Sequence, residues 1–145
     1  MLLLSILFLL AGYSCSNKNK EIEDKEYFTI KMNETVFLSS SNDEMTITFK
    51  NVTDSRCYGK MNEVCFPNLA FIFLSVKCNN INTDITLTIS GFLNEFENEH
   101  SPQFPKDTLG YRFNLVNLSP SPDYATKINE DDYIAKIKIS KLWKK

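Results

Sequence analysis

Strict alternation of apolar and polar side chains is the feature that most restricts the fold of this chain. Residues 44–50, 84–90 and 133–140 each place apolar residues at every second position and mostly polar residues between them. Strands of this kind are buried on one side and solvated on the other, as in an antiparallel sheet. The side chains expected to point inward are Met45, Ile47, Phe49, Ile85, Leu87, Ile89, Tyr133, Ala135, Ile137 and Ile139.

Further segments complete the prediction of an all-β fold. Residues 69–76 are apolar on both faces, and their Phe, Ile and Val residues favour a central strand over a buried helix. Residues 111–116 form another strand, with Tyr111, Phe113 and Leu115 inward, and residues 28–31 and 35–38 form two short strands joined near Asn33. We therefore predict a single antiparallel β-sandwich, immunoglobulin-like in outline, with a small barrel as the alternative.

Composition supports one folded domain and argues against a nucleic-acid partner. The 145 residues suit a single domain, and eleven Phe and six Tyr against four Gly indicate a packed core. The net charge is −2 at pH 7, whereas nucleic-acid binding favours a strongly basic face. The connections at residues 91–110 and 119–123 are expected to be surface loops.

Residues 1–14 predict that the chain is exported. The apolar run at residues 2–10, broken only by Ser5, is far shorter than the roughly 20 residues of a membrane-spanning helix. It has the length of a signal-peptide core, and the small residues Ala11 and Gly12 follow it. The usual positive charge before this core is missing, which is explained either by a start upstream of Met1 or by an unusual signal.

The sequence Gly12-Tyr13-Ser14-Cys15 resembles the lipobox of bacterial lipoproteins. The resemblance implies cleavage before Cys15 and anchoring to a membrane through acyl chains on that cysteine. Gly12 and Tyr13 depart from the commonest lipobox and match the relaxed form of some Gram-negative bacteria. Ser16 in place of Asp implies the outer membrane, by the rule of enterobacterial lipoproteins. The alternative is an ordinary secretory signal cut nearby, with Cys15 as a spare thiol.

The residues after Cys15 are polar and charged, which is typical of a flexible tether. The expected organisation is a lipoprotein signal peptide at residues 1–14, a lipid-anchored tether at residues 15–26 and a β-sandwich domain at residues 27–145. The expected location is the cell envelope, on the outer membrane of a Gram-negative bacterium.

Four cysteines are present, and three remain if Cys15 is lipidated. An exported protein meets an oxidising compartment, so a disulfide is expected. We favour a bond between Cys57 and Cys65, because the short loop between them closes easily. Cys65 with Cys78 is the main alternative. No Cys-x-x-Cys occurs and His100 is the only histidine, so no metal site is predicted.

Residues 49–57, ending in Asp-Ser-Arg-Cys, and residues 65–76 resemble a pattern in small uncharacterised bacterial lipoproteins. In that family, a strand ending in Asp-Ser-Arg-Cys-Pro is followed by a second cysteine and a long apolar strand. The resemblance covers about residues 44–140 and implies that Cys57 pairs with Cys65. Tyr58 stands where the family has Pro. From their own chemistry, Asp54 is expected to accept backbone N–H groups in a turn and Arg56 to pair with a carboxylate.

Catalytic and modification sites are weakly indicated. His100 lies in a polar loop without a glycine-framed serine, so a solvated histidine is favoured over a nucleophile's base. Acidic residues near 95–99 and 130–132 are more typical of solvated surfaces than of paired catalytic carboxylates or a calcium loop. Asp107-Thr108-Leu109 resembles an O-glycosylation motif of some Gram-negative lineages, which makes Thr108 a candidate glycosylation site. No cofactor motif is present.

Two function classes follow. The favoured hypothesis is a non-enzymatic binding or structural module, held at the membrane through lipid on Cys15, that contacts an envelope protein or glycan. The alternative is a small envelope hydrolase or protease inhibitor. A binding module is expected to expose an aromatic patch, for which the candidates are Phe92, Phe96, Phe104 and Trp143.

Overall fold

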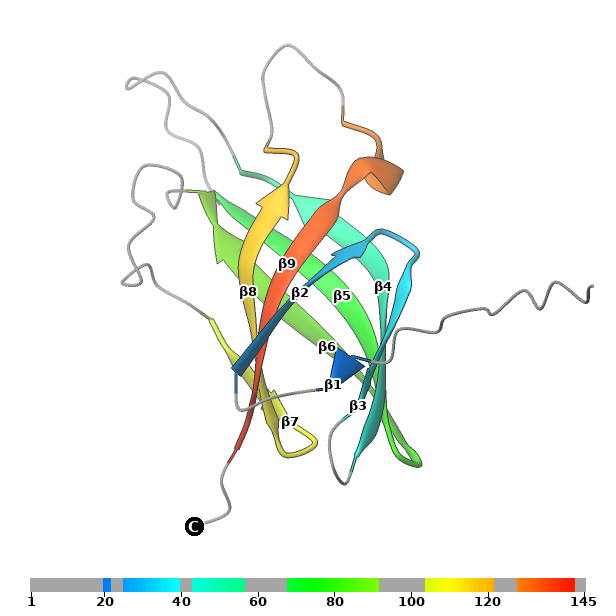
Figure 1. Ribbon diagram of the computed structural model, residues 1–145. Helices are drawn as coiled ribbons and strands as arrows, with labels where there is room; N and C mark the ends of the chain where they lie inside the picture. The colour runs from blue at the N-terminus through cyan, green and yellow to red at the C-terminus, as the bar shows by residue number, and fades with distance from the viewer. Residues whose placement is uncertain are drawn as a thin grey trace, which may run out of the picture.

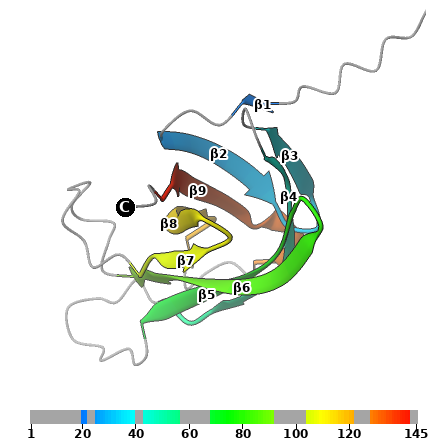
Figure 2. The ribbon, with the colours of Figure 1, turned by 90° about the horizontal axis from the view of Figure 1, so that it is seen from below.

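The structure, a computed structural model, describes residues 20–21, 25–39, 43–56, 68–91, 104–121 and 128–142. Two β-sheets pack face to face in this part of the chain, with their strands running in broadly the same direction (Figure 1). A view turned by 90° shows the space between the sheets, where the core lies (Figure 2). The predicted all-β sandwich is therefore confirmed.

Each sheet is formed mainly by strands that are neighbours in sequence. Sheet A has the order β1-β3-β4-β5-β6, and sheet B has the order β2-β9-β8-β7. The two-residue strand β1 pairs in parallel with β3, and all other pairs are antiparallel. The two-layer outline matches expectation, whereas β3 to β6 and β7 to β9 are simple meanders, and β2 joins sheet B by pairing with β9. The strands of sheet A are β1 (Lys20–Glu21), β3 (Thr35–Ser39), β4 (Glu44–Asp54), β5 (Leu69–Cys78) and β6 (Ile81–Ser90); those of sheet B are β2 (Lys25–Lys31), β7 (Lys106–Thr108), β8 (Tyr111–Ser119) and β9 (Ile134–Lys141).

The apolar rows predicted from alternation form the core between the sheets. Every side chain named above as inward-pointing is buried, and Phe49 and Phe113 are fully enclosed. The segment at residues 69–76 lies in β5, between β4 and β6, as a central strand. Its second apolar face is not covered by the other sheet, and Phe73 on this face is 38% exposed.

A β-bulge in β4 changes which residues face the core. Phe49 pairs with Leu74 and Asn51 pairs with Phe73, which leaves Lys50 as an extra residue on β4. Because successive side chains of a strand point to opposite faces, one extra residue exchanges the faces of everything that follows. Val52 is buried as a result, and Asp54 turns its carboxylate inward.

The turns have a left-handed backbone, which Asn and Gly tolerate and which Leu109 adopts less readily. Asn33 has φ of 65° between β2 and β3, where the chain passes from sheet B to sheet A. Asn79 has φ of 54° in the β5–β6 turn. Leu109 and Gly110, with φ of 53° and 80°, join β7 to β8 in the two-residue turn that suits twisted hairpin strands.

Strands are found beyond two of the expected boundaries. Lys20–Glu21 and the start of β2 at Lys25 are strands, although residues 15–26 were expected to be a tether. Strand pairing uses backbone groups, so polar side chains do not prevent it, and Lys25 pairs opposite Ser140. The expected loop at residues 91–110 also contains β7, and Phe104 forms a bridge to Thr88.

Candidate functional site

A buried ion pair joins the two sheets at the end of β4. Asp54 accepts a hydrogen bond from the backbone N–H of Arg56 at 3.0 Å, which forms a tight turn. The guanidinium of Arg56 then folds back, and its Nε and Nη2 lie 2.9 and 2.6 Å from the two carboxylate oxygens. Both side chains are only 4% exposed. The expected roles of Asp54 and Arg56 are confirmed, and the two residues are each other's partners.

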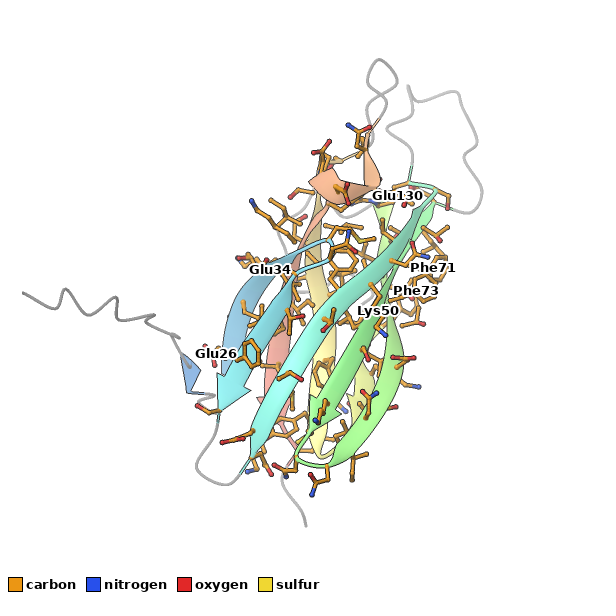
Figure 3. All side chains as sticks on the ribbon, turned by 90° about the vertical axis from the view of Figure 1, so that its right-hand side faces the viewer. Glu26, Glu34, Lys50, Phe71, Phe73 and Glu130 are labelled. Carbon is orange, nitrogen blue, oxygen red and sulfur yellow. The ribbon has the colours of Figure 1, made fainter. Side chains whose placement is uncertain are left out.

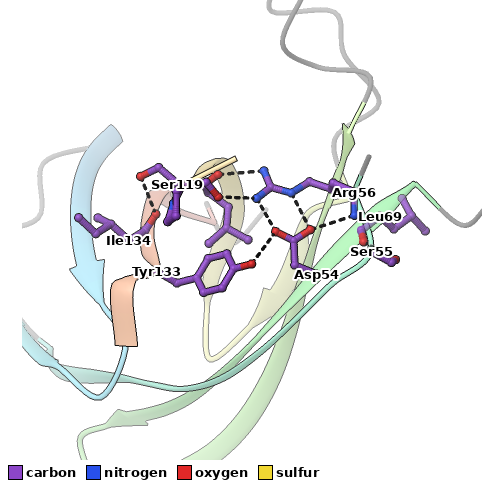
Figure 4. Close-up of polar contacts among 9 residues, drawn as sticks. Asp54, Ser55, Arg56, Leu69, Ser119, Tyr133 and Ile134 are labelled. Carbon is purple, nitrogen blue, oxygen red and sulfur yellow. Dashed lines mark hydrogen bonds and ion pairs between the residues drawn. The ribbon is translucent and has the colours of Figure 1, made fainter. Parts of the chain in front are cut away.

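The remaining donors of Arg56 reach the opposite sheet (Figure 4). Its Nη1 donates to the carbonyl of Leu118 at 2.9 Å, and its Nη2 donates to the carbonyl of Pro120 at 3.2 Å. The hydroxyl of Tyr133 donates to Asp54 at 3.1 Å from the same side. These contacts use four of the five N–H donors of the guanidinium, and their acceptor atoms belong to both sheets and to the loop after β8, so the cluster is a structural link between the sheets.

The pKa of the Tyr133 hydroxyl is strongly raised by this environment. Burial raises the pKa of Tyr133 to about 12, and the negative charge of Asp54 adds to the shift. Since the pKa is raised in the folded state, the contribution to stability is complete below the unfolded value of about 10 and is lost as the pH rises through 12.

The unfolding temperature is expected to fall more steeply between about pH 10 and pH 12 in the wild type than in Tyr133→Phe. The variant has no hydroxyl to lose a proton on unfolding, whereas all other titrating groups are common to both proteins. Thermal unfolding followed by circular dichroism across this range measures the difference. Parallel curves for the two proteins would contradict the prediction.

A second polar cluster lies at the opposite end of the sandwich, around Asp43. Its carboxylate accepts hydrogen bonds from the hydroxyl of Tyr111 at 2.7 Å and the amide of Asn79 at 3.1 Å, and Nζ of Lys141 lies at 3.5 Å. These contacts, led by that from Tyr111, lower the pKa of Asp43. A single ionised carboxylate fully engaged by donors is suited to holding the sheets together and not to proton transfer.

The free thiol of Cys78 settles one of the alternatives for the cysteines. Cys78 is buried and unbonded, and burial raises the pKa of its thiol, which lowers its reactivity at neutral pH. It ends the ten-residue strand β5, about 30 Å from the end at Leu69. The alternative disulfide from Cys65 to Cys78 is therefore wrong. Cys15, Cys57 and Cys65 lie outside the described residues, and the Cys57–Cys65 bond stays a prediction.

Thr108 lies in a strand and not in the expected open loop. It is half-buried at the end of β7 and pairs with Tyr111 across the turn. The neighbouring Asp107 is held by Arg112 at 2.7 Å. The motif therefore occupies the tip of a hairpin, and glycosylation of Thr108 stays a prediction.

Three phenylalanines gather on the outer face of sheet A, and we call Phe71, Phe73 and Phe104 the aromatic face. Phe71 and Phe73 lie on β5 beside Lys50 of the neighbouring strand (Figure 3). Thr88 of β6 pairs with Phe71 on one side and with Phe104 on the other. Phe104 is 48% and Phe73 is 38% exposed.

Only Phe104 of the aromatic face was a sequence candidate. Phe92, Phe96 and Trp143 lie outside the described residues. Phe71 and Phe73 were assigned to a central strand, although their signal was present in the sequence: residues 69–76 are apolar on both faces while neighbouring strands alternate. The same pattern is also compatible with a strand whose outer face is apolar and exposed.

The remaining candidates add no reactive centre in the described part of the chain. Residues Glu130–Asp132 form an exposed 3-10 turn before β9, and the described ranges contain no group of three His, Cys, Asp or Glu side chains placed to hold a metal ion. A hollow of about 290 Å³ at the lower end of sheet A is lined by Phe37, Glu44, Lys77 and their neighbours. His100 and the acidic residues near 95–99 lie outside the described residues.

Comparisons with known proteins gave no match from which a function could be inferred. Among the residues that the structure describes, no helix has the length and apolar character needed to cross a membrane. The chain matches no protein-family model, no curated protein and no solved structure.

Proposed function

We propose that this chain is a lipid-anchored, non-enzymatic binding module of the bacterial cell envelope, and that its aromatic face binds an envelope protein. Anchoring through Cys15 rests on the leader at residues 1–14 and on the lipobox resemblance. Two acyl chains give stable attachment to a membrane, and the proposed membrane is the outer membrane of a Gram-negative bacterium.

The observation that carries the binding role is the exposure of Phe73 and Phe104 on one sheet face. Large aromatic side chains are enriched at the centres of protein interfaces, and charged residues are depleted there. On this face the phenylalanines alternate with threonines: Phe71 lies between Thr53 and Thr88, and Phe73 has Thr86 opposite it. Lys50 is the charged residue beside them. This composition favours a protein partner over a glycan.

The binding face is tested by photo-crosslinking in intact bacteria. The photo-reactive analogue p-benzoylphenylalanine is placed at position 73 or 104, and at position 37 as a matched control. Phe37 is also on the outer face of sheet A and is 57% exposed, but it lies on β3, away from the aromatic face. We expect one adduct of defined mass from positions 73 and 104, and none from position 37.

A companion variant shows whether the adduct depends on the face itself. With the probe at position 104, Phe73→Ser is expected to remove the adduct while the unfolding temperature stays close to that of the wild type. Equal labelling from position 37, or an adduct of twice the protein's own mass, would overturn the proposal. The intact mass of the same preparation reports the anchor, because lipidation adds acyl chains to Cys15 and Cys15→Ala prevents it.

A further inference from the structure

The outer face of sheet B carries a group of lysines, and we call Lys31, Lys136 and Lys138 with Tyr27 the lysine face. Lys136 and Lys138 alternate with the buried Ala135 and Ile137 on β9, so they point away from the core. In the ladder Tyr27 of β2 lies opposite Lys138. The face is thus assembled from the first and the last strand of sheet B.

Within the described residues, the ammonium groups of this face are not held in ion pairs, and the neighbouring carboxylate of Glu34 accepts the backbone N–H of Lys31 at 2.8 Å. Nζ of Lys136 and of Lys138 lie 5.6 and 5.4 Å from the centre of the Tyr27 ring, which orients both ammonium groups without cancelling their charge. Among the described residues, no carboxylate forms an ion pair with Lys31, Lys136 or Lys138. Arg112 on the same sheet differs, because Asp107 pairs with it.

The lysine face lies within a limited reach of the anchor and on the side of the domain opposite the aromatic face. Lys20, the first described residue, is five positions after Cys15, and five residues span at most about 18 Å. Lys20 belongs to β1 at the edge of sheet A, and the next strand along the chain is β2 of sheet B, which carries Tyr27 and Lys31. The outer faces of two packed sheets point in opposite directions, so the lysine face and the aromatic face lie on opposite sides of the domain.

We propose that the lysine face rests on the anionic phospholipid surface in which the acyl chains of Cys15 are embedded, a step that rests on the proposed function. Anionic headgroups attract basic residues that are held within a Debye length, about 10 Å at moderate salt. Each lysine at such a surface strengthens attachment about fivefold. In this orientation the aromatic face points away from the membrane and is open to a partner.

The lipidated full-length protein is reconstituted into vesicles that contain phosphatidylglycerol and phosphatidylethanolamine, or phosphatidylcholine alone. Lysines are then labelled with an amine-reactive reagent and quantified by mass spectrometry. We expect Lys31, Lys136 and Lys138 to lose reactivity only on the anionic vesicles, and to regain it at about 1 M salt, where the Debye length is about 3 Å. Lys50 and Lys77 on sheet A are internal controls whose reactivity stays unchanged.

Two double variants, each of which replaces two lysines by uncharged glutamine, test whether these lysines cause the protection. Lys136→Gln with Lys138→Gln is expected to restore the reactivity of Lys31 on anionic vesicles, whereas Lys50→Gln with Lys77→Gln leaves it low. Equal reactivity on both vesicle types in a protein that floats with the vesicles would overturn the inference. A protein that fails to float with either vesicle overturns the lipid anchor instead. Protection that follows added acidic peptide and not the lipid would assign the face to a protein and also overturn it.

Discussion

Deleting Lys50 is expected to remove the bulge of β4 while the domain still unfolds cooperatively. Lys50 is the extra residue of the bulge, and without it the residues after Phe49 continue in regular alternation, so Val52 and Asp54 still face inward. If the two side chains turned outward instead, the lost burial of one aliphatic side chain would remove about 1.5–3 kcal/mol and the broken buried ion pair about 3–5 kcal/mol. The sum is comparable to the whole stability of an ordinary domain, about 5–15 kcal/mol.

Urea unfolding followed by near-ultraviolet circular dichroism measures this effect. Lys50→Ala is the control, because it keeps the bulge and removes only an exposed side chain. It is expected to change the free energy of unfolding by no more than about 0.5 kcal/mol. If the deletion variant loses cooperative unfolding, the inward faces of Val52 and Asp54 depend on the bulge itself, and the prediction is wrong.

Arg56→Ala is expected to lower the free energy of unfolding by about 3–5 kcal/mol. The substitution leaves the Asp54 carboxylate, which is 4% exposed, without its cation. It also removes the donors to the carbonyls of Leu118 and Pro120, which belong to the other sheet and the loop after it. Chemical unfolding at neutral pH gives the value directly.

Arg112→Ala provides the matched comparison for this prediction. Arg112 pairs with Asp107 at 2.7 Å, almost as closely as Arg56 pairs with Asp54, but its side chain is 51% exposed. Solvent screens an exposed ion pair, so Arg112→Ala is expected to lower the free energy of unfolding far less than Arg56→Ala. Similar losses in both would show that burial does not decide the strength of these pairs.

Alternation along the sequence predicted which residues lie in strands and which of them are buried. Ile85, Leu87 and Ile89 illustrate this, because a period of two depends only on the local chain. The outward positions follow from the same period, and Lys136 and Lys138 were therefore predictable as surface residues. Their meeting with Tyr27 was not, because β2 and β9 are brought together by pairing between the two ends of the domain.

The candidate site was only partly predictable for related reasons. Phe104 was identified as an exposed aromatic residue, but its bridge to Thr88 depends on how the chain returns to sheet A. The pairing of Asp54 with Arg56 needs both the bulge at Lys50 and the turn after β4, and a one-residue insertion leaves no periodic signal of its own. Two-residue strands such as β1 carry no pattern long enough to be recognised.

The position of β9 affects how the molecule acquires its structure. This strand is the last of the described strands, yet it lies between β2 and β8 and holds sheet B together. While a ribosome is still synthesising residues before 134, β2 has no partner in its sheet, and the inner face of sheet A has nothing complete to pack on. Folding that depends on such distant pairing is slow. The domain would thus stay unfolded until residues 134–141 have been synthesised, and an unfolded polypeptide is the state that can be threaded through a narrow export channel.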